Sequence, residues 1–321
     1  MRLTFLTPSA ALIGLAVAVP VVALAFAQVR AHVARVLLRL PVPPTRLWPP
    51  IAAIAALSAL VAVGAAQPVL ERERDVTVRT DAEAFLVFDT TRSMAASRSP
   101  GSQTRFERAI ALAKRLRAGM PELRFGIATL TDRVLPHLFP TSRAAAFHST
   151  LDEAIGVERP ASVQRGNAIG TNLAGLVVVP RTAFFSPESK RRVLVVFTDA
   201  ETRPFDPNEL RIEFRRAPIA TALVRVGSEG ERVFTSDGLV DARYRPPLGV
   251  EGELATFAAA TRARTFDERE FGSVRDFVRR SVGSGGPRTR AKEVDPTPLA
   301  AWAFGFAFLP LAFLLWRRNL R

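Results

Sequence analysis

Five oxygen-bearing side chains in the middle of the chain have the types and the order of a binding site for a hard cation. Asp89, Thr91 and Ser93 follow an apolar run at alternate positions, and Asp199 follows a second apolar run. Thr171 lies between them in the sequence, at the start of a predicted helix. Carboxylate and hydroxyl oxygens are hard donors, which suit Mg²⁺ or Mn²⁺ better than zinc or copper. We therefore predict a Mg²⁺ or Mn²⁺ site whose neutral hydroxyl ligands leave the ion able to accept a carboxylate from outside.

The surrounding pattern predicts the sheet that would bring these residues together. Short apolar runs alternate with longer amphipathic segments, which is typical of an α/β fold with a doubly wound, mostly parallel sheet and helices on both faces. In such sheets, ligands bind beyond the carboxyl ends of the strands. The predicted strands are residues 84–88, 125–130, 134–139, 193–197 and 219–226, and the predicted helices are residues 104–117, 143–155, 172–179, 251–263 and 273–282.

The polar segments after these strands resemble the metal-ion-dependent adhesion site (MIDAS) of von Willebrand factor A (vWA) domains, which have a Rossmann-like fold. The family pattern is D-x-S/T-x-S, then a distant threonine, then an aspartate after a hydrophobic strand. The matching segments are FLVFDTTRSM, GTNLAG and VVFTDAE, and the resemblance covers about residues 82–282. It implies that the hydroxyls bind the ion directly and that the aspartates bind it directly or through water. Carried over residue by residue, it implies metal ligands at Asp89, Thr91, Ser93, Thr171 and Asp199.

Two positions depart from the family pattern. Thr91 stands where serine is commoner, so its hydroxyl is chemically equivalent but its extra methyl group tightens the loop. Ala200 replaces the glycine that usually follows the last aspartate. Because glycine tolerates backbone conformations that alanine disfavours, this replacement bears on the geometry of that turn.

Three apolar segments predict membrane insertion. Residues 10–27, 49–66 and 299–316 contain no charged side chain, and a length of about 18 residues lies near the lower limit for a transmembrane helix. Tryptophans lie at or near the ends of these segments, where aromatic rings favour the lipid headgroup layer. We therefore predict three transmembrane helices, with buried core helices of a soluble fold as the alternative.

Arginines predict the orientation in the membrane. Residues 29–46 carry four arginines and no acid, and the C-terminal tail after residue 316 carries three more. Positively charged loops stay in the cytoplasm, so the domain between the second and third spans is predicted to be extracytoplasmic, in a multi-pass protein of the cytoplasmic membrane. The alternative is a cleaved signal peptide ending at Ala25-Phe26-Ala27, which would invert this topology. These arginines account for much of the net charge of +14, so no nucleic-acid partner is predicted.

The predicted layout comprises two N-terminal transmembrane helices with a basic cytoplasmic loop (1–70), a stalk (71–81), a vWA-like domain (82–282), a linker (283–298) and a C-terminal transmembrane helix with a basic tail (299–321). Charged and apolar residues alternate over 71–80, so an edge strand is the alternative to a stalk there. The chain resembles the Bat-type aerotolerance membrane proteins in this layout and in its N-terminal sequence, where residues 5–12 (FLTPSAAL) are similar to the opening FLTPSALIGL. The resemblance implies work in an envelope complex, with other vWA membrane proteins and a MoxR-type AAA+ ATPase as partners.

The predicted function is the metal-dependent capture of a protein partner that presents an acidic residue, without catalysis. Haloacid dehalogenase-like phosphohydrolases also start with an aspartate after a strand, but Thr91 stands where they need a second carboxylate as general acid–base. A structural scaffold is the other alternative, in which Asp89 only caps a helix and Asp199 only ends a strand. Arg92, beside the site, is interpreted as an exposed surface residue rather than as a partner for an external acid.

Overall fold

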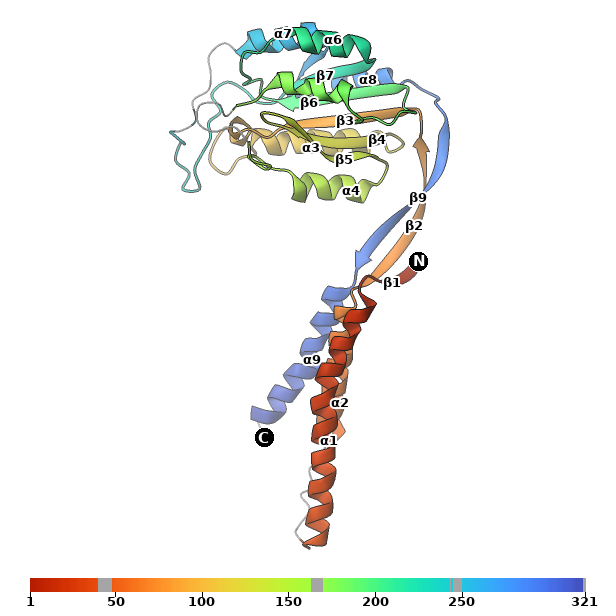
Figure 1. Ribbon diagram of the computed structural model, residues 1–321. Helices are drawn as coiled ribbons and strands as arrows, with labels where there is room; N and C mark the ends of the chain where they lie inside the picture. Colours follow the sequence, from red (N-terminus) through yellow and green to blue (C-terminus); the bar gives the residue numbers. More distant parts are fainter. Residues whose placement is uncertain (40–47, 163–169, 243, 245–249, 320–321) are drawn as a thin grey trace. The chain divides into compact units, whose positions relative to one another are not determined.

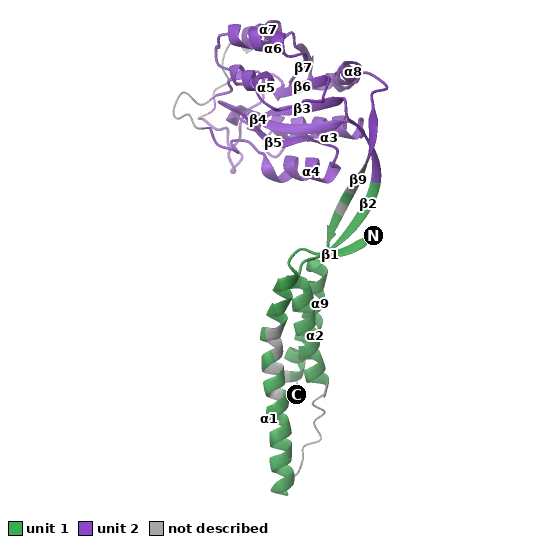
Figure 2. Cartoon of the chain, turned by 45° about the vertical axis from the view of Figure 1, so that its right-hand side comes forward, with its two compact units in different colours: residues 1–74, 294–321 green, residues 75–293 purple. Residues whose placement is uncertain are grey.

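The structure is a computed structural model that describes residues 1–39, 48–162, 170–242, 244 and 250–319. The chain divides into two compact units, shown in different colours in Figure 2. One unit contains residues 75–293, and the other contains residues 1–74 and 294–321. All five predicted metal ligands belong to the unit of residues 75–293, which we call the α/β domain.

Six strands form the central sheet of the α/β domain: β3 (Ala82–Asp89), β4 (Arg124–Leu130), β5 (Val134–Thr141), β6 (Arg191–Thr198), β7 (Ile219–Arg225) and β8 (Arg264–Asp267). Their order is β5-β4-β3-β6-β7-β8, and the first five of these strands are labelled in Figure 1. All neighbouring pairs are parallel except β4 and β5, which are antiparallel. The predicted mostly parallel sheet is confirmed, and its antiparallel edge strand makes it mixed.

Helices cover both faces of this sheet (Figure 1). Strand β3 explains why both faces need cover, because every one of its residues is buried. Leu86 and Phe88 pack in one hydrophobic cluster, whereas Phe85 and Val87 pack in the other. A strand buried on both sides reads as a continuous apolar run, which is why the sequence reveals it clearly. The helices of the first face are α3 (Arg105–Ala118), α4 (Ala144–Ser149) and α8 (Phe271–Val282), and those of the second are α5 (Val178–Arg181), α6 (Asn208–Arg216) and α7 (Val250–Thr261).

Several elements differ from their predicted form. The predicted helix at 143–155 consists of α4 followed by a π-helical turn, η3 (Thr150–Ala154). The predicted helix at 172–179 begins as a 3₁₀-helix, η5 (Leu173–Val177), and continues as the short helix α5. Helix α6 and strand β8 were not predicted. Only two residues of α6 are buried, and β8 is a short edge strand with few apolar residues, so neither has a strong hydrophobic pattern.

The segments predicted as a stalk and a linker contain strands. A three-stranded sheet has the order β1-β2-β9, with β1 (Arg2–Phe5) antiparallel to β2 (Pro68–Arg79). Strand β9 (Arg288–Pro298) occupies most of the segment predicted as a polar linker. The sequence RTRAKEVDPTP has no apolar run, so its strand character depends on backbone pairing that periodicity does not reveal.

The three apolar segments form helices α1 (Ile13–Leu37), α2 (Trp48–Ala65) and α9 (Ala300–Asn319). Helix α1 continues to residue 37, so the first part of the predicted cytoplasmic loop is helical, and residues 40–47 lie outside the described residues. Within the described part of the chain, one helix, Ala300–Arg317, is long and apolar enough to cross a membrane, and only 11% of that window is buried. Residues Pro49–Ala65 form a shorter apolar helix. This criterion therefore supports one of the three predicted spans.

The ring of Phe85 packs closely against Gly126, which leaves no room for a side chain there. Gly126 of β4 pairs with Phe85 of β3, and a Cβ atom at Gly126 would lie 2.6 Å from the Phe85 ring. We expect Gly126→Ala to lower the free energy of unfolding by about 1–3 kcal/mol, because the buried ring has to move. Gly272→Ala is the control, because a Cβ atom there meets nothing within 4 Å. Urea unfolding of the detergent-solubilised chain, followed by circular dichroism, measures both, and equal stabilities would contradict the prediction.

Candidate metal centre

Asp89 and Asp199 lie at the same edge of the sheet. Strands β3 and β6 are parallel neighbours with Phe88 opposite Phe197, so the residues that follow these two positions lie side by side. Thr198 Oγ1 donates a hydrogen bond of 2.7 Å to Asp89 Oδ2. The predicted convergence of the two strand ends is therefore present in the structure.

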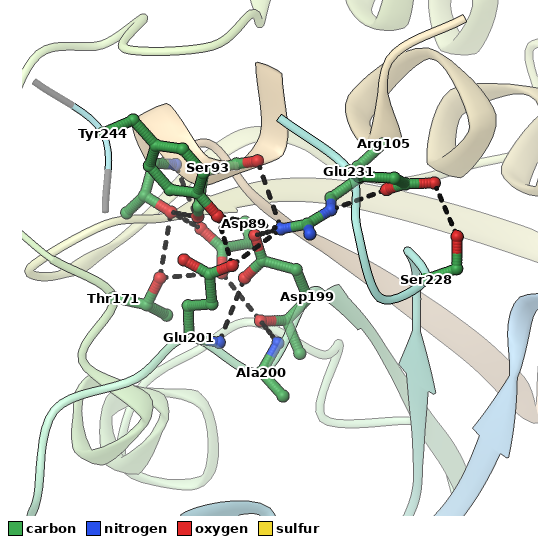
Figure 3. A network of polar contacts seen from close by, with 12 residues as sticks. Asp89, Ser93, Arg105, Thr171, Asp199, Ala200, Glu201, Ser228, Glu231 and Tyr244 are labelled. Atoms are coloured by element: carbon green, nitrogen blue, oxygen red, sulfur yellow. Dashed lines mark hydrogen bonds and ion pairs between the residues drawn. The ribbon is translucent and has the colours of Figure 1, made fainter. Parts of the chain in front are cut away.

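Three hydroxyl groups gather around the Asp89 carboxylate (Figure 3). Thr91 Oγ1 donates to Asp89 Oδ1 at 2.6 Å, and Thr171 Oγ1 donates to Asp89 Oδ2 at 2.8 Å. Thr91 Oγ1 also lies 3.0 Å from Ser93 Oγ and 3.0 Å from Thr171 Oγ1. Residues from two distant segments thus form one buried group of oxygens, which we call the hydroxyl cluster: Thr91, Ser93 and Thr171.

Local backbone structure places each hydroxyl of this cluster. The Thr91 backbone N–H donates to Asp89 Oδ1 at 3.0 Å, which turns the chain sharply as it leaves β3. A 3₁₀ turn, η2 (Arg92–Ala95), then carries the Ser93 side chain. Thr171 is held against the loop after β6, because Thr202 Oγ1 donates to the Thr171 carbonyl at 3.0 Å.

The Asp89 carboxylate is fully buried and accepts four hydrogen bonds. Burial raises the pKa of Asp89, and the negative charge of Asp199 raises it further, to about 7. The donated hydrogen bonds act in the opposite direction, but they do not offset these two effects. Without a cation, this carboxylate therefore takes up a proton far more readily than an exposed aspartate.

A second polar group lies beside the hydroxyl cluster and contains Asp199. Arg105 Nη1 lies 2.8 Å from Asp199 Oδ2 and 2.8 Å from Glu201 Oε1 (Figure 3). Arg105 Nε lies 2.9 Å from Glu231 Oε2, and the Tyr244 hydroxyl donates to Glu201. We call Asp199, Arg105, Glu201, Glu231 and Tyr244 together the arginine cluster.

Charge compensation inside the arginine cluster is visible in its pKa shifts. Burial lowers the pKa of Arg105, but the nearby carboxylates outweigh it and raise the pKa above its ordinary value. Burial and the charge of Asp199 raise the pKa of Glu201. Burial also tends to raise the pKa of Glu231, yet Arg105 and Arg108 hold it below its ordinary value. The guanidinium therefore stays charged, and it is shared among several acids.

Sequence reasoning missed the arginine cluster and Thr198. Arg105 is separated by 94 residues from Asp199 and by 126 from Glu231, so no local sequence pattern predicts these ion pairs. Thr198 could have been found from the β3–β6 register, which places it beside Asp89. Its position directly before Asp199 was the available signal.

Ala200 and Arg92 are two further residues beside the site that the sequence singled out. Ala200 has a φ of +72°, in the left-handed region that favours glycine and that alanine enters only at a cost. Arg92 is partly exposed and pairs with Asp241 and Glu158 of its own chain. It is therefore a surface residue with internal partners, as interpreted, and those partners already neutralise its charge.

The residues at the site fit a hard cation better than a soft one. Among the described residues, no group of three or more His, Asp or Glu side chains converges in a way that could hold a metal ion. Thr91 and Thr171 donate their protons to Asp89, which leaves their oxygen lone pairs for a cation. Such neutral oxygen donors suit Mg²⁺ and Mn²⁺.

Several solved structures are similar to this chain. An aerotolerance-related membrane protein from Bacteroides fragilis is 18% identical, with a TM-score of 0.49, and the match covers 63% of this chain and 98% of that one. BatB from Bacteroides thetaiotaomicron is 19% identical, with a TM-score of 0.46, and the match covers 61% of this chain and 97% of that one. Proximal thread matrix protein 1 from the mussel byssus, solved with a zinc-occupied MIDAS motif, is 13% identical with a TM-score of 0.39, over 78% of this chain and 55% of that one.

No protein-family model matches the sequence, and no curated protein is similar to it. These similar structures include Bat-type proteins and a protein with a MIDAS motif. Both are kinds of protein that the sequence resembles. At these identities the likeness concerns the fold alone. The assignment of ligands in this chain therefore rests on the contacts of Asp89, the hydroxyl cluster and the arginine cluster.

The raised pKa of Asp89 predicts a pH-dependent effect of Asp89→Asn in the absence of cations. Between the ordinary value of 3.8 and about 7, the folded state keeps a proton that the unfolded state has lost, so stability falls as the pH rises through this range. Asparagine cannot ionise, so Asp89→Asn should raise the free energy of unfolding more at pH 8 than at pH 5, by more than about 1 kcal/mol. Urea unfolding in EDTA at both pH values is the measurement. A stability difference that is the same at pH 5 and pH 8 would argue against an ionisable, buried Asp89.

Proposed function

We propose that the α/β domain binds a divalent cation through Asp89, Thr91, Ser93, Thr171 and Asp199. The observation that carries this proposal is the gathering of the hydroxyl cluster on one buried carboxylate at the sheet edge. Buried carboxylates are costly unless a counter-charge neutralises them, and a divalent ion would supply that charge.

The spacing of the oxygens supports Mg²⁺ or Mn²⁺ as the ion. In an octahedral shell with metal–oxygen distances of about 2.0–2.1 Å, adjacent ligand oxygens are about 2.8–3.0 Å apart. Thr91 Oγ1 lies 3.0 Å from both Ser93 Oγ and Thr171 Oγ1. The hydrogen bonds that Thr91 and Thr171 donate to Asp89 thus hold their hydroxyl oxygens at a separation that fits such a shell.

We further propose that the bound ion captures an acidic side chain of a protein partner and that the domain is not catalytic. Neutral hydroxyl ligands leave a divalent ion with affinity for an external carboxylate. Thr91 offers no general acid–base at neutral pH, and its hydroxyl is already hydrogen-bonded to Asp89. A haloacid dehalogenase-type phosphohydrolase would instead turn over a phosphate ester in the presence of magnesium, which a colorimetric assay detects.

The proposed setting is the cytoplasmic membrane. The apolar helix at Ala300–Arg317 supports membrane association. The flanking arginines and the layout resembling Bat-type proteins support three spans with the α/β domain outside the cytoplasm. Other vWA membrane proteins and a MoxR-type AAA+ ATPase are the proposed members of the complex, from that resemblance.

Metal removal and a single substitution test partner capture. We expect the wild-type chain to bind about one Mn²⁺ ion per molecule and to retain its partner only without EDTA, because the ion links the two proteins. Asp89→Ala should abolish both properties while leaving membrane insertion intact. Pull-down from solubilised membranes, with and without EDTA, measures partner recovery.

Asp152→Ala is the matched control for this substitution. Asp152 is an exposed acid of the same domain that pairs with Lys114, so its loss should leave Mn²⁺ binding and partner recovery unchanged. Equal partner recovery by wild type and Asp89→Ala, with and without EDTA, would defeat the proposal.

The proposed topology has its own test. In right-side-out spheroplasts, an added protease should cut the α/β domain, because the domain faces the outside in a three-span protein. In inside-out vesicles the same domain should be protected. The reverse pattern would favour the cleaved signal peptide and place the domain in the cytoplasm.

A further inference from the structure

Arg105 binds the carboxylate of a proposed metal ligand. Its side chain is only 8% exposed, and its Nη1 atom lies 2.8 Å from Asp199 Oδ2. The same guanidinium lies 2.8 Å from Glu201 and 2.9 Å from Glu231. Asp199 is therefore the proposed ligand that is already paired with a positive charge of the protein.

The fold builds this position with several contacts. Thr104 caps helix α3 in a capping box with Glu107, which fixes Arg105 at the first helical position. The Arg105 backbone N–H donates to the Ala96 carbonyl at 2.9 Å. Gly227 has a φ of +125°, and a Cβ atom there would lie 2.6 Å from Arg105 Nε, so a residue without a side chain makes room for the guanidinium. These contacts hold Arg105 in place beside Asp199.

We infer that Arg105 and the divalent cation compete for the Asp199 carboxylate, an inference that rests on the proposed metal site. Two positive charges next to one buried carboxylate repel each other, and the repulsion is strong where water is excluded. The ion pair therefore weakens cation binding and keeps Asp199 neutralised while the site holds no cation. Glu201 and Glu231 remain as partners of Arg105 when Asp199 binds the ion, so the guanidinium is not left unpaired.

A purely structural role of Arg105 predicts the opposite sign. If the ion pair only held Asp199 in a binding position, then removing Arg105 would weaken cation binding. If Arg105 competes with the ion, then removing it leaves the carboxylates of Asp199, Glu201 and Glu231 without their shared counter-charge, and cation binding becomes tighter. The direction of the change in metal affinity therefore separates the two roles.

The experiment is a Mn²⁺ titration of the detergent-solubilised full chain, with free Mn²⁺ measured by electron paramagnetic resonance. We expect Arg105→Met to bind Mn²⁺ more tightly than wild type, on the order of tenfold or more. Arg108→Met is the matched control, because Arg108 lies on the same helix and pairs with Glu231 and Glu268 but not with Asp199. Its Mn²⁺ affinity should change by less than about threefold.

A double variant covers the case in which Arg105→Met fails to fold. Arg105→Met/Glu231→Gln removes one of the uncompensated acids, and Arg108 keeps Glu268 as its partner. It should also bind Mn²⁺ more tightly than wild type. Unchanged or weaker binding in a folded variant would overturn the competition. Equal Mn²⁺ binding by wild type and Asp89→Ala would overturn the metal site itself, so the two failures are distinguishable.

Discussion

The buried carboxylate of Asp89 determines how this edge of the sheet is organised. Donors from three separate segments, at Thr91, Thr171 and Thr198, hydrogen-bond to its two oxygens. Hydroxyl dipoles alone do not neutralise a buried charge, so the carboxylate is driven either to take up a proton or to attract a cation. The raised pKa and the proposed metal affinity have this common cause.

The sheet makes such a carboxylate possible because its central strands are rigid and dry. Strand β3 is buried along its whole length, between helices on both faces, and β6 is nearly so. A polar residue at the end of such a strand is held by main-chain pairing on both sides, so its side chain has few alternative positions. Parallel neighbours also end together, which brings Asp89 beside Thr198 without any contribution from the loops.

Two clusters of different character meet at this edge. Neutral hydroxyls surround Asp89, whereas Asp199 belongs to a cluster of acids around the Arg105 guanidinium. The first cluster offers oxygen lone pairs, and the second holds the positive charge that, in the proposed competition, an ion would displace from Asp199. Both use hydrogen-bonding groups that are largely shielded from water, so small changes in charge have large effects on affinity. Ala200, with its positive φ, forms the turn that joins Asp199 to Glu201.

Most of the sheet and the five proposed ligands were predictable from the amino-acid order, because a strand buried on both faces is a continuous apolar run and polar residues that follow such runs gather at one edge. Helix α6, strand β8 and strand β9 were not predicted, because their sequences are largely polar. The helix buries only two residues against the domain, and the strands depend on pairing with distant strands. The arginine cluster was also beyond reach. Arg105 reads as an ordinary charged residue at the start of a helix, and only the folded chain brings it to acids 94, 96 and 126 residues away. The amino-acid sequence determines which oxygen-bearing residues are available to an ion. Only the tertiary structure decides that Asp199 is paired with Arg105, because the two residues are distant in the chain and are buried together.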